Sequence, residues 1–352
     1  MKTILVLYII FPFSFLYAQA TNEEIREFVK EELNSKDFPN NTQLSIGFIS
    51  GDSIFTYGVT KKRKWKQVVN DDLVFEIGSI SKVFTSFLLT HCVERGLLKL
   101  SDTIQHDLDV EWKVKDPITY EMLSNHTSGL PRLPSNLFKY MAKTPRNPYV
   151  NYDKEALISY LEEGLKLESE PGKEYAYSNV GAGLLGYLIS EKLDMSYEKA
   201  IRTMILDDLG MGSTSTELNG YSQEEMVQGL NISGSVTDNW DFDVLVGAGG
   251  IKSTVLDMVK FMNAQLSDSD SEIEMLQKKT FETDEINLAL GWHIIIDKNY
   301  LWHNGSTGGY RSSFVLDPNS KTGVIILSNV SYAHPDATFI DQLVFELIDK
   351  LM

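Results

Sequence analysis

The sequence predicts an α/β fold in which one sheet is flanked by helices and carries an inserted helical region. Apolar runs typical of strands occur near the start of the chain, at residues 44–49 and 54–59 on either side of a polar turn. They recur near its end, at residues 289–296, 314–316 and 324–327, while the pattern between them is mostly helical. Strands at both ends and helices in the middle imply one sheet built from distant segments.

The helices follow from apolar residues that recur every three or four positions. Residues 22–35 carry Ile25, Phe28, Val29 and Leu33 on one side and glutamates on the other. Further helices are expected at residues 120–124, 155–164, 181–193 and 337–351. A basic turn or loop is expected at residues 61–66, and a proline-rich surface excursion at residues 131–151.

The chain of 352 residues is long enough to bury a large core in one sizeable domain or two closely packed ones. We assign one catalytic domain to residues 21–352. Its sheet part covers roughly residues 21–74 and 245–352, and its helical part roughly residues 75–244.

Residues 1–20 have the pattern of a secretory signal. Lys2 is the only charge, residues 4–16 are a short apolar stretch, and Ala18-Gln19-Ala20 is a small-x-small cleavage site. The apolar stretch is too short to span a bilayer comfortably. We therefore expect cleavage near Ala20, export to the periplasm or the medium, and no stable membrane insertion.

Composition argues against several classes of partner and cofactor. The formal charge is −17, from 32 basic and 49 acidic residues, so we expect no nucleic-acid partner. Cys92 is the only cysteine, on the apolar face of a predicted helix, which favours a buried structural thiol. The six histidines show neither H-E-x-x-H nor a helical pair, so we expect no metal and no cofactor.

The first chemical motif lies between Phe75 and Gly96. An apolar, strand-like lead-in ends at Gly78, and the three-and-four spacing of a helix follows it. Ser79 and Lys82 then share one face of the first turn, so a hydroxyl lies within reach of an amine. The helix dipole and partial burial both disfavour an ammonium, which would let Lys82 act as a base and Ser79 as a nucleophile.

The spacing S-x-x-K is not specific by itself. A helix cap followed by a surface lysine would explain Ser79 and Lys82 equally simply. The same spacing recurs at Ser196 and Lys199, which we interpret as a solvated helix face.

Two later motifs add groups that suit the same chemistry. Tyr177 and Asn179 follow a Pro171-Gly172 turn, and a phenol near Lys82 could move a proton. An aromatic loop packed on a helix would leave the same pattern. Residues 302–310 read W-H-N-G-S-T-G-G-Y, and their small residues would let a strand edge approach a ligand closely. His303, taken alone, is equally compatible with a structural role.

In this order the motifs resemble the serine β-lactamase and penicillin-recognising enzyme family, closest to class C β-lactamases and secreted DD-peptidases. The likeness extends from about residue 22 to residue 352 and includes G-S-I-S-K-V-F-T, S-G-L-P, P-G…Y-S-N and H-N-G-S-T-G-G-Y. It implies a β-lactamase/transpeptidase-like fold: an antiparallel sheet flanked by helices, an inserted all-helical region, and a site in the cleft between them.

The resemblance also implies roles for individual residues. Ser79 would form an acyl-enzyme, and Lys82 and Tyr177 would share the proton transfers. Asn179 would bind the amide of the substrate's side chain. The backbone N–H groups of Ser79 and Ser306 would form the oxyanion hole.

One departure bears on the substrate. Class C enzymes usually have Lys-Thr-Gly where this chain has His303-Asn304-Gly305. The tripeptide Lys321-Thr322-Gly323 follows an Asp-Pro-Asn-Ser turn signal, so we interpret it as part of a turn between strands. A histidine is mostly neutral above its reference pKa of about 6.5. We therefore expect activity on carboxylate substrates to rise as the pH falls through about that value.

The functional hypothesis is an exported serine hydrolase that acts through an acyl-enzyme on β-lactam or D-Ala-D-Ala-type bonds. Its partner would be a small molecule or a peptidoglycan peptide, and we expect a monomer. An alternative is a carboxylesterase or D-amino-acid amidase on the same scaffold, which the neutral His303 favours. A third possibility is a penicillin-binding sensor without turnover.

Overall fold

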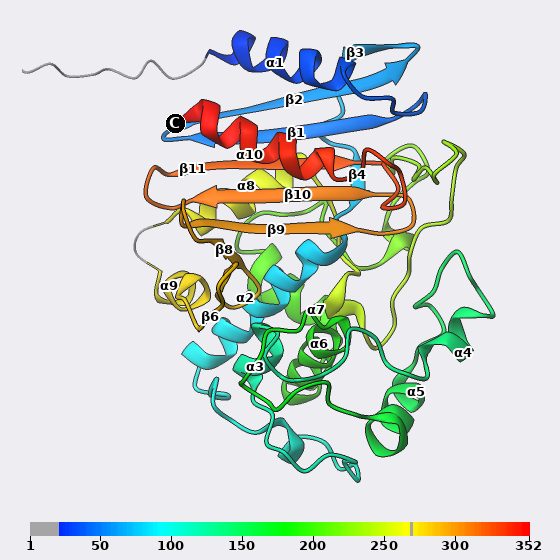
Figure 1. Ribbon diagram of the computed structural model, residues 1–352, viewed down its shortest axis with the longest axis vertical. Helices are drawn as coiled ribbons and strands as arrows, with labels where there is room; N and C mark the ends of the chain where they lie inside the picture. Colours follow the sequence, from blue (N-terminus) through cyan, green and yellow to red (C-terminus); the bar gives the residue numbers. More distant parts are fainter. Residues whose placement is uncertain (1–20, 268–269) are drawn as a thin grey trace, which may run out of the picture.

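The computed structural model describes residues 21–267 and 270–352. The proposed leader, residues 1–20, lies outside the described residues. Figure 1 shows a large sheet with the terminal helices α1 (Asn22–Asn34) and α10 (Phe339–Leu351) packed on it, and a helical region below. Among the described residues, no helix has the length and apolar character needed to cross a membrane.

Among the residues that the structure describes, the main sheet has nine strands and is antiparallel throughout. Ile46 of β1 lies opposite Ile326 of β11, so segments from the two ends of the chain form the middle of the sheet, as the sequence predicts. The strands lie in the order β3 (Lys64–Val68), β2 (Ser53–Lys62), β1 (Gln43–Ser50), β11 (Thr322–Ser328), β10 (Arg311–Asp317), β9 (Tyr300–Ser306), β8 (His293–Ile295), β7 (Asn287–Leu288) and β6 (Phe281–Glu282).

Two separate hydrophobic clusters pack on the two faces of the sheet. One cluster packs α1 and α10 on the sheet through residues such as Ile25 and Leu343. The other joins the opposite face to α8 and the helical region, where the rings of Phe84 and Phe261 stack at 3.9 Å. The remaining helices are α2 (Ser81–Glu94), α3 (Tyr120–Ser124), α4 (Leu137–Met141), α5 (Lys154–Ser159), α6 (Asn179–Leu193), α7 (Tyr197–Ile201), α8 (Val255–Gln265) and α9 (Ser271–Gln277).

A small second sheet supports the segment that leads into the first motif. Its two strands are β4 (Val74–Glu76) and β5 (Lys252–Thr254), which pair antiparallel. Ile77 N also donates to Ile251 O at 3.1 Å, which continues the pairing by one residue. The segments that precede and follow the helical region are therefore hydrogen-bonded to each other directly beside Ser79.

Of the basic turn or loop expected at residues 61–66, the structure contains only a tight turn, and the rest of the segment is strand. The chain turns at Arg63, where φ is +62°, and returns as β3 paired with β2. Trp65 stabilises this strand because its ring is buried and its Nε1 donates to Leu33 O at 3.0 Å. Alternation leaves the lysines on either side of Trp65 exposed, and these exposed lysines give the segment the appearance of a loop in the sequence.

The helix of the first motif differs from expectation in two ways. Ser79 belongs to a 3₁₀ turn, Gly78–Ile80, and α2 begins only at Ser81. Nearly every side chain of α2 is buried, including the free thiol of Cys92, rather than one face alone. The reason is that α2 lies between α6, α9 and the turn Val246–Ala248, so it has no solvent face over most of its length.

Candidate active site

Ser79 and Lys82 are in direct contact. Lys82 Nζ lies 3.0 Å from Ser79 Oγ, and it donates a second hydrogen bond to Ala248 O at 2.6 Å. Ser79 is half-buried, whereas the lysine side chain is 2 % exposed. The predicted dyad is therefore formed, with its hydroxyl accessible and its amine enclosed.

Burial changes the chemistry of that amine. It lowers the pKa of Lys82 well below the ordinary value for lysine, and the nearby charge of Arg132 lowers it further. A neutral amine has two N–H groups and one lone pair. Because Ala248 O accepts one N–H, the lone pair can face the Ser79 hydroxyl and accept its proton.

Tyr177 completes the group of three side chains. Lys82 Nζ lies 4.9 Å from the centre of the Tyr177 ring. Burial raises the pKa of the Tyr177 phenol, and a hydrogen bond with Ser79 only partly opposes this effect. The free protein therefore holds a neutral phenol beside an amine whose charged form is disfavoured, and Lys82 is the better base of the two.

Local hydrogen bonds fix the loop that carries Tyr177 and Asn179. Ser178 caps α6 by accepting a hydrogen bond from Gly181 N at 2.9 Å, and its own N–H donates to His126 Nδ1 at 3.2 Å. The N–H of Asn179 donates to Arg132 O at 2.9 Å. Asn179 Oδ1 is buried and has no hydrogen-bond partner within residues 21–267 and 270–352, so it is the polar atom of this loop that a ligand could satisfy.

Two glycines let β9 approach the turn that holds Ser79. A Cβ on Gly305 would lie 1.9 Å from Ile77 O, and one on Gly78 would lie 2.5 Å from Ser306 N. Gly78 also has φ +52°, which side chains other than glycine rarely adopt. The backbone of Ser306 therefore lies directly against the Ser79 turn, as an oxyanion hole made by both residues requires.

The side chains of β9 divide between the two faces of the strand. His303 and Gly305 are buried against the helical region, whereas Ser306 Oγ accepts a hydrogen bond from Arg311 Nη1 at 2.7 Å. Arg311 is in turn paired with Asp341 of α10. By alternation Asn304 lies on the same side as Ser306, so its side chain is on the face opposite to that of His303.

His303 does not behave as the sequence suggested. Its Nδ1 lies 2.6 Å from Asn304 O, which makes Nδ1 the protonated nitrogen of the neutral ring. Burial is the main cause that holds the pKa of His303 well below 6.5. The low pKa of His303 removes the physical basis for a gain of activity as the pH falls through about 6.5, and that pH dependence stays a prediction.

The Beta-lactamase family model matches residues 46–348, which is most of the chain. The chain belongs to the Beta-lactamase family. Two curated relatives show how low the sequence identity to related proteins is. A Beta-lactamase of Providencia stuartii is 27 % identical over 300 residues, covering 84 % of this chain and 68 % of that protein. Protein flp of Staphylococcus aureus (strain NCTC 8325 / PS 47) is 24 % identical over 329 residues, covering 88 % of this chain and 64 % of that protein.

Solved structures of the family share the fold. A class C beta-lactamase aligns with a TM-score of 0.76 at 21 % identity, covering 94 % of this chain and 96 % of that one. The octameric penicillin-binding protein homologue from Pyrococcus abyssi aligns with a TM-score of 0.75 at 23 % identity, covering 92 % of this chain and 77 % of that one. The expected β-lactamase/transpeptidase-like architecture is thereby confirmed.

Sequence reasoning missed several side chains that surround Tyr177. The His126 ring lies 4.4 Å from that of Tyr177, and His293 lies 5.2 Å from His303 and 2.8 Å, through Nε2, from the Tyr175 hydroxyl. Burial lowers the pKa of His293 to about 4. In the part of the chain that is described, no group of three or more potential ligands could hold a metal ion. His126 directly precedes the T-S-G-L-P turn, and that motif is the sequence signal that could have identified it as a neighbour of the site.

The second S-x-x-K motif lies on a solvated helix face, as predicted, and its serine also caps the helix. Ser196 caps α7 by accepting a hydrogen bond from Lys199 N at 3.2 Å, and both side chains are exposed. Lys321 likewise lies in the turn between β10 and β11, with φ +52°. Neither lysine belongs to the site.

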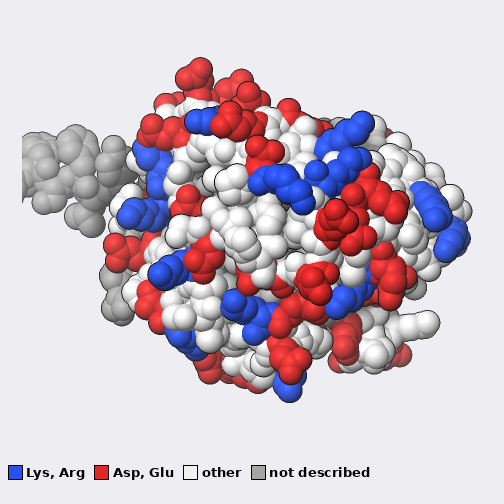
Figure 2. Space-filling model, turned by 90° about the horizontal axis from the view of Figure 1, so that it is seen from below, with Lys and Arg blue, Asp and Glu red and all other residues white. Residues whose placement is uncertain are grey.

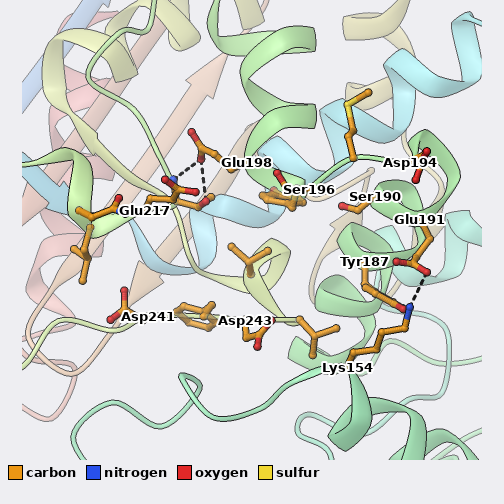
Figure 3. A pocket seen from close by; sticks show the side chains of 18 residues that line it. Lys154, Tyr187, Ser190, Glu191, Asp194, Ser196, Glu198, Glu217, Asp241 and Asp243 are labelled. Atoms are coloured by element: carbon orange, nitrogen blue, oxygen red, sulfur yellow. Dashed lines mark hydrogen bonds and ion pairs between the residues drawn. The ribbon is translucent and has the colours of Figure 1, made fainter.

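A pocket lies apart from these residues. It has a volume of about 930 Å³ and is lined by α6, α7 and residues 216–219 and 241–246. Figure 3 shows that its walls are acidic, with Glu191, Glu198 and Asp243 among the labelled side chains. It contains none of Ser79, Lys82 and Tyr177, and we place the candidate active site at Ser79 and Lys82 because a hydroxyl contacts a buried amine there.

Proposed function

We propose that the protein is an exported serine hydrolase that forms an acyl-enzyme at Ser79. The observation that carries this proposal is the 3.0 Å contact between the accessible Ser79 hydroxyl and the buried, low-pKa amine of Lys82. The substrates proposed are β-lactam amides and D-Ala-D-Ala-type peptides. The names of the relatives, among them a Beta-lactamase at 27 % identity, support this class of substrate.

Acylation would begin when Lys82 accepts the proton of Ser79. The Ser79 oxygen attacks the carbonyl carbon, and the oxyanion that forms faces the backbone N–H groups of Ser79 and Ser306. When the tetrahedral intermediate collapses, the bond to the leaving group breaks. The leaving group would take the proton from Lys82 through Tyr177, whose ring centre lies 4.9 Å from Lys82 Nζ and whose hydroxyl is hydrogen-bonded to Ser79.

Deacylation would reverse the same proton path. A water loses its proton to Lys82 through Tyr177, attacks the acyl carbon, and releases the acid and the Ser79 hydroxyl. Asn179 would hold the acyl side chain through its unpaired Oδ1. The rate of this second step separates a β-lactamase, which turns the acyl-enzyme over, from a peptidase that penicillin inhibits.

The second candidate is a carboxylesterase or D-amino-acid amidase that uses the same residues. The neutral, buried His303 favours it, because a lysine at this position would provide a permanent cation for a carboxylate on the leaving group. An ester or amide without that carboxylate needs no such cation.

A substrate panel tests the proposal. Purified protein and its Ser79→Ala variant are given nitrocefin, a D-Ala-D-Ala peptide and a short nitrophenyl ester, and penicillin adducts are sought by intact mass. We expect turnover or an adduct in the wild type and neither in Ser79→Ala. Ester turnover without cephalosporin turnover selects the second candidate. A wild type that gives neither turnover nor an adduct overturns the proposed function.

Export and a monomeric state are also part of the proposal. The leader pattern of residues 1–20 supports export to the periplasm or the medium after cleavage near Ala20. The face seen in Figure 2 has many acidic side chains with basic ones interspersed, which suits a chain without a nucleic-acid partner. N-terminal sequencing of the exported protein and sedimentation analysis test the cleavage site and the monomer.

A further inference from the structure

One cation at the site has no role in the mechanism above. The guanidinium carbon of Arg132 lies 5.0 Å from the centre of the Tyr177 ring, and Arg132 is exposed. Its backbone oxygen accepts the N–H of Asn179 at 2.9 Å, so it is tied to the loop that holds Asn179. Arg132 thus stands beside the mouth of the site, on the Asn179 side of Tyr177.

The other cationic candidates around Ser79 are already used or are neutral. Lys82 contacts Ser79 and Ala248 and has a depressed pKa. Arg311 is paired with Asp341, and His303 is buried and neutral. Within residues 21–267 and 270–352, Arg132 forms no ion pair with a carboxylate.

An arginine in this position suits a particular ligand. Guanidinium is charged at all physiological pH values and binds carboxylates through two parallel hydrogen bonds. The face of Tyr177 holds the guanidinium near the site without neutralising it. The aromatic contact thus limits the conformations of an otherwise flexible side chain and so reduces the entropy that binding would cost.

We propose that Arg132 determines substrate specificity by binding a carboxylate on the acyl part of the substrate. We assign Arg132 to the acyl part, and not to the leaving group, because Arg132 belongs to the loop beside Asn179. The leaving group would lie along β9. This inference rests on the proposed function. It assigns the recognition of negative charge to the helical region, whereas the strand position that would usually hold a cation carries a neutral histidine.

Matched esters test the proposal. The mono-4-nitrophenyl ester of glutaric acid carries a free carboxylate on its acyl part, and the methyl 4-nitrophenyl diester masks it. We expect the wild type to prefer the anionic ester. In Arg132→Gln, the ratio of kcat/KM between the two esters should fall by about tenfold or more, mainly through KM, because a charge-assisted hydrogen bond is lost. Arg132→Lys should restore part of the ratio.

The control variant is Arg146→Gln. Arg146 is another exposed arginine of the helical region, paired with Asp238 at 3.0 Å, so its loss removes the same charge elsewhere. Its ester ratio should equal that of the wild type. An equal loss for both esters in Arg132→Gln, or a wild type without preference, overturns the assignment.

The two proposals fail in different ways. Turnover of the neutral diester reports the serine hydrolase alone, so its presence without anionic preference overturns only the role of Arg132. Binding of free glutarate to Ser79→Ala, measured by calorimetry, needs no turnover. Glutarate should bind Ser79→Ala more tightly than the double variant Ser79→Ala/Arg132→Gln, and equal affinities would count against Arg132 even if the enzyme is active.

Discussion

Lys82 Nζ lies 2.6 Å from the carbonyl oxygen of Ala248, a residue that follows the helical region in the sequence. This hydrogen bond joins the first motif to the turn Val246–Ala248. It holds the amine beside Ser79 in a place from which water is excluded. The reactivity of Ser79 therefore depends on a segment that carries none of the recognised motifs.

Replacing Lys82 by methionine should abolish acylation while Ser79 remains in place. The general base is lost, and such a loss typically costs about 10²–10⁴ in rate. Stopped-flow nitrocefin kinetics and the rate of penicillin adduct formation measure it. The matched control is Lys199→Met, which removes the exposed lysine of the second S-x-x-K motif and should have the wild-type rate. Adduct formation by Lys82→Met at the wild-type rate would exclude Lys82 as the base.

The dependence of kcat/KM on pH should respond to the charge of Arg132. Acylation needs neutral Lys82, so kcat/KM for an uncharged ester should rise as the pH rises through the depressed pKa of Lys82. Arg132 contributes to that depression. In Arg132→Gln the pKa should be higher, and the acid limb of the profile should move to higher pH. A limb that stays in place or moves to lower pH contradicts this coupling.

His303 should not titrate near pH 6.5. Because burial lowers its pKa well below that value, its ring signals in an NMR titration should stay at the neutral position between pH 8 and about 6. A His303→Gln variant assigns the resonance. A midpoint close to 6.5 would restore the pH dependence that the sequence suggested.

The buried histidines should make the fold sensitive to acid. A group whose pKa is lower in the folded state stabilises the fold above its unfolded pKa, and this contribution is lost as the pH falls towards the folded pKa. For His293, with a folded pKa of about 4, the window runs from about 6.5 down to about 4. The free energy of unfolding should fall there by up to about 1.4 kcal/mol per pH unit for each such histidine. Urea unfolding at a series of pH values measures this dependence. The free energy of unfolding of His293→Gln should fall less steeply with decreasing pH than that of the wild type.

Adding one methyl group at Gly305 should disrupt the oxyanion hole. The new Cβ would lie 1.9 Å from Ile77 O, which forces β9 away from the Ser79 turn. Loss of an oxyanion donor typically costs about 10²–10³ in rate. Gly220→Ala is the control, since no atom lies within 4 Å of its new Cβ. Esterase or nitrocefin kinetics of both variants, with thermal unfolding as a check on folding, decide the point.

The sequence by itself determined the order of the motifs and the local geometry of each. Three residues of helical chain bring Ser79 and Lys82 together, and two residues of loop present Tyr177 and Asn179 side by side. These relations depend on backbone geometry over a few residues, and that geometry is the same in any fold. Hydrophobic periods predicted one sheet with a helical insertion, whereas its antiparallel arrangement followed only from the family resemblance.

Only the tertiary structure decided the electrostatics. Burial under Ala248 lowers the pKa of Lys82, burial against His293 keeps His303 neutral, and the loop contact with Asn179 brings Arg132 to Tyr177. Desolvation and Coulomb interactions depend on which distant segments pack around a charge, and spacing along the chain does not encode that. The motifs therefore point to Ser79 as the proposed nucleophile, whereas the packing around them shifts the pKa values of the groups beside it.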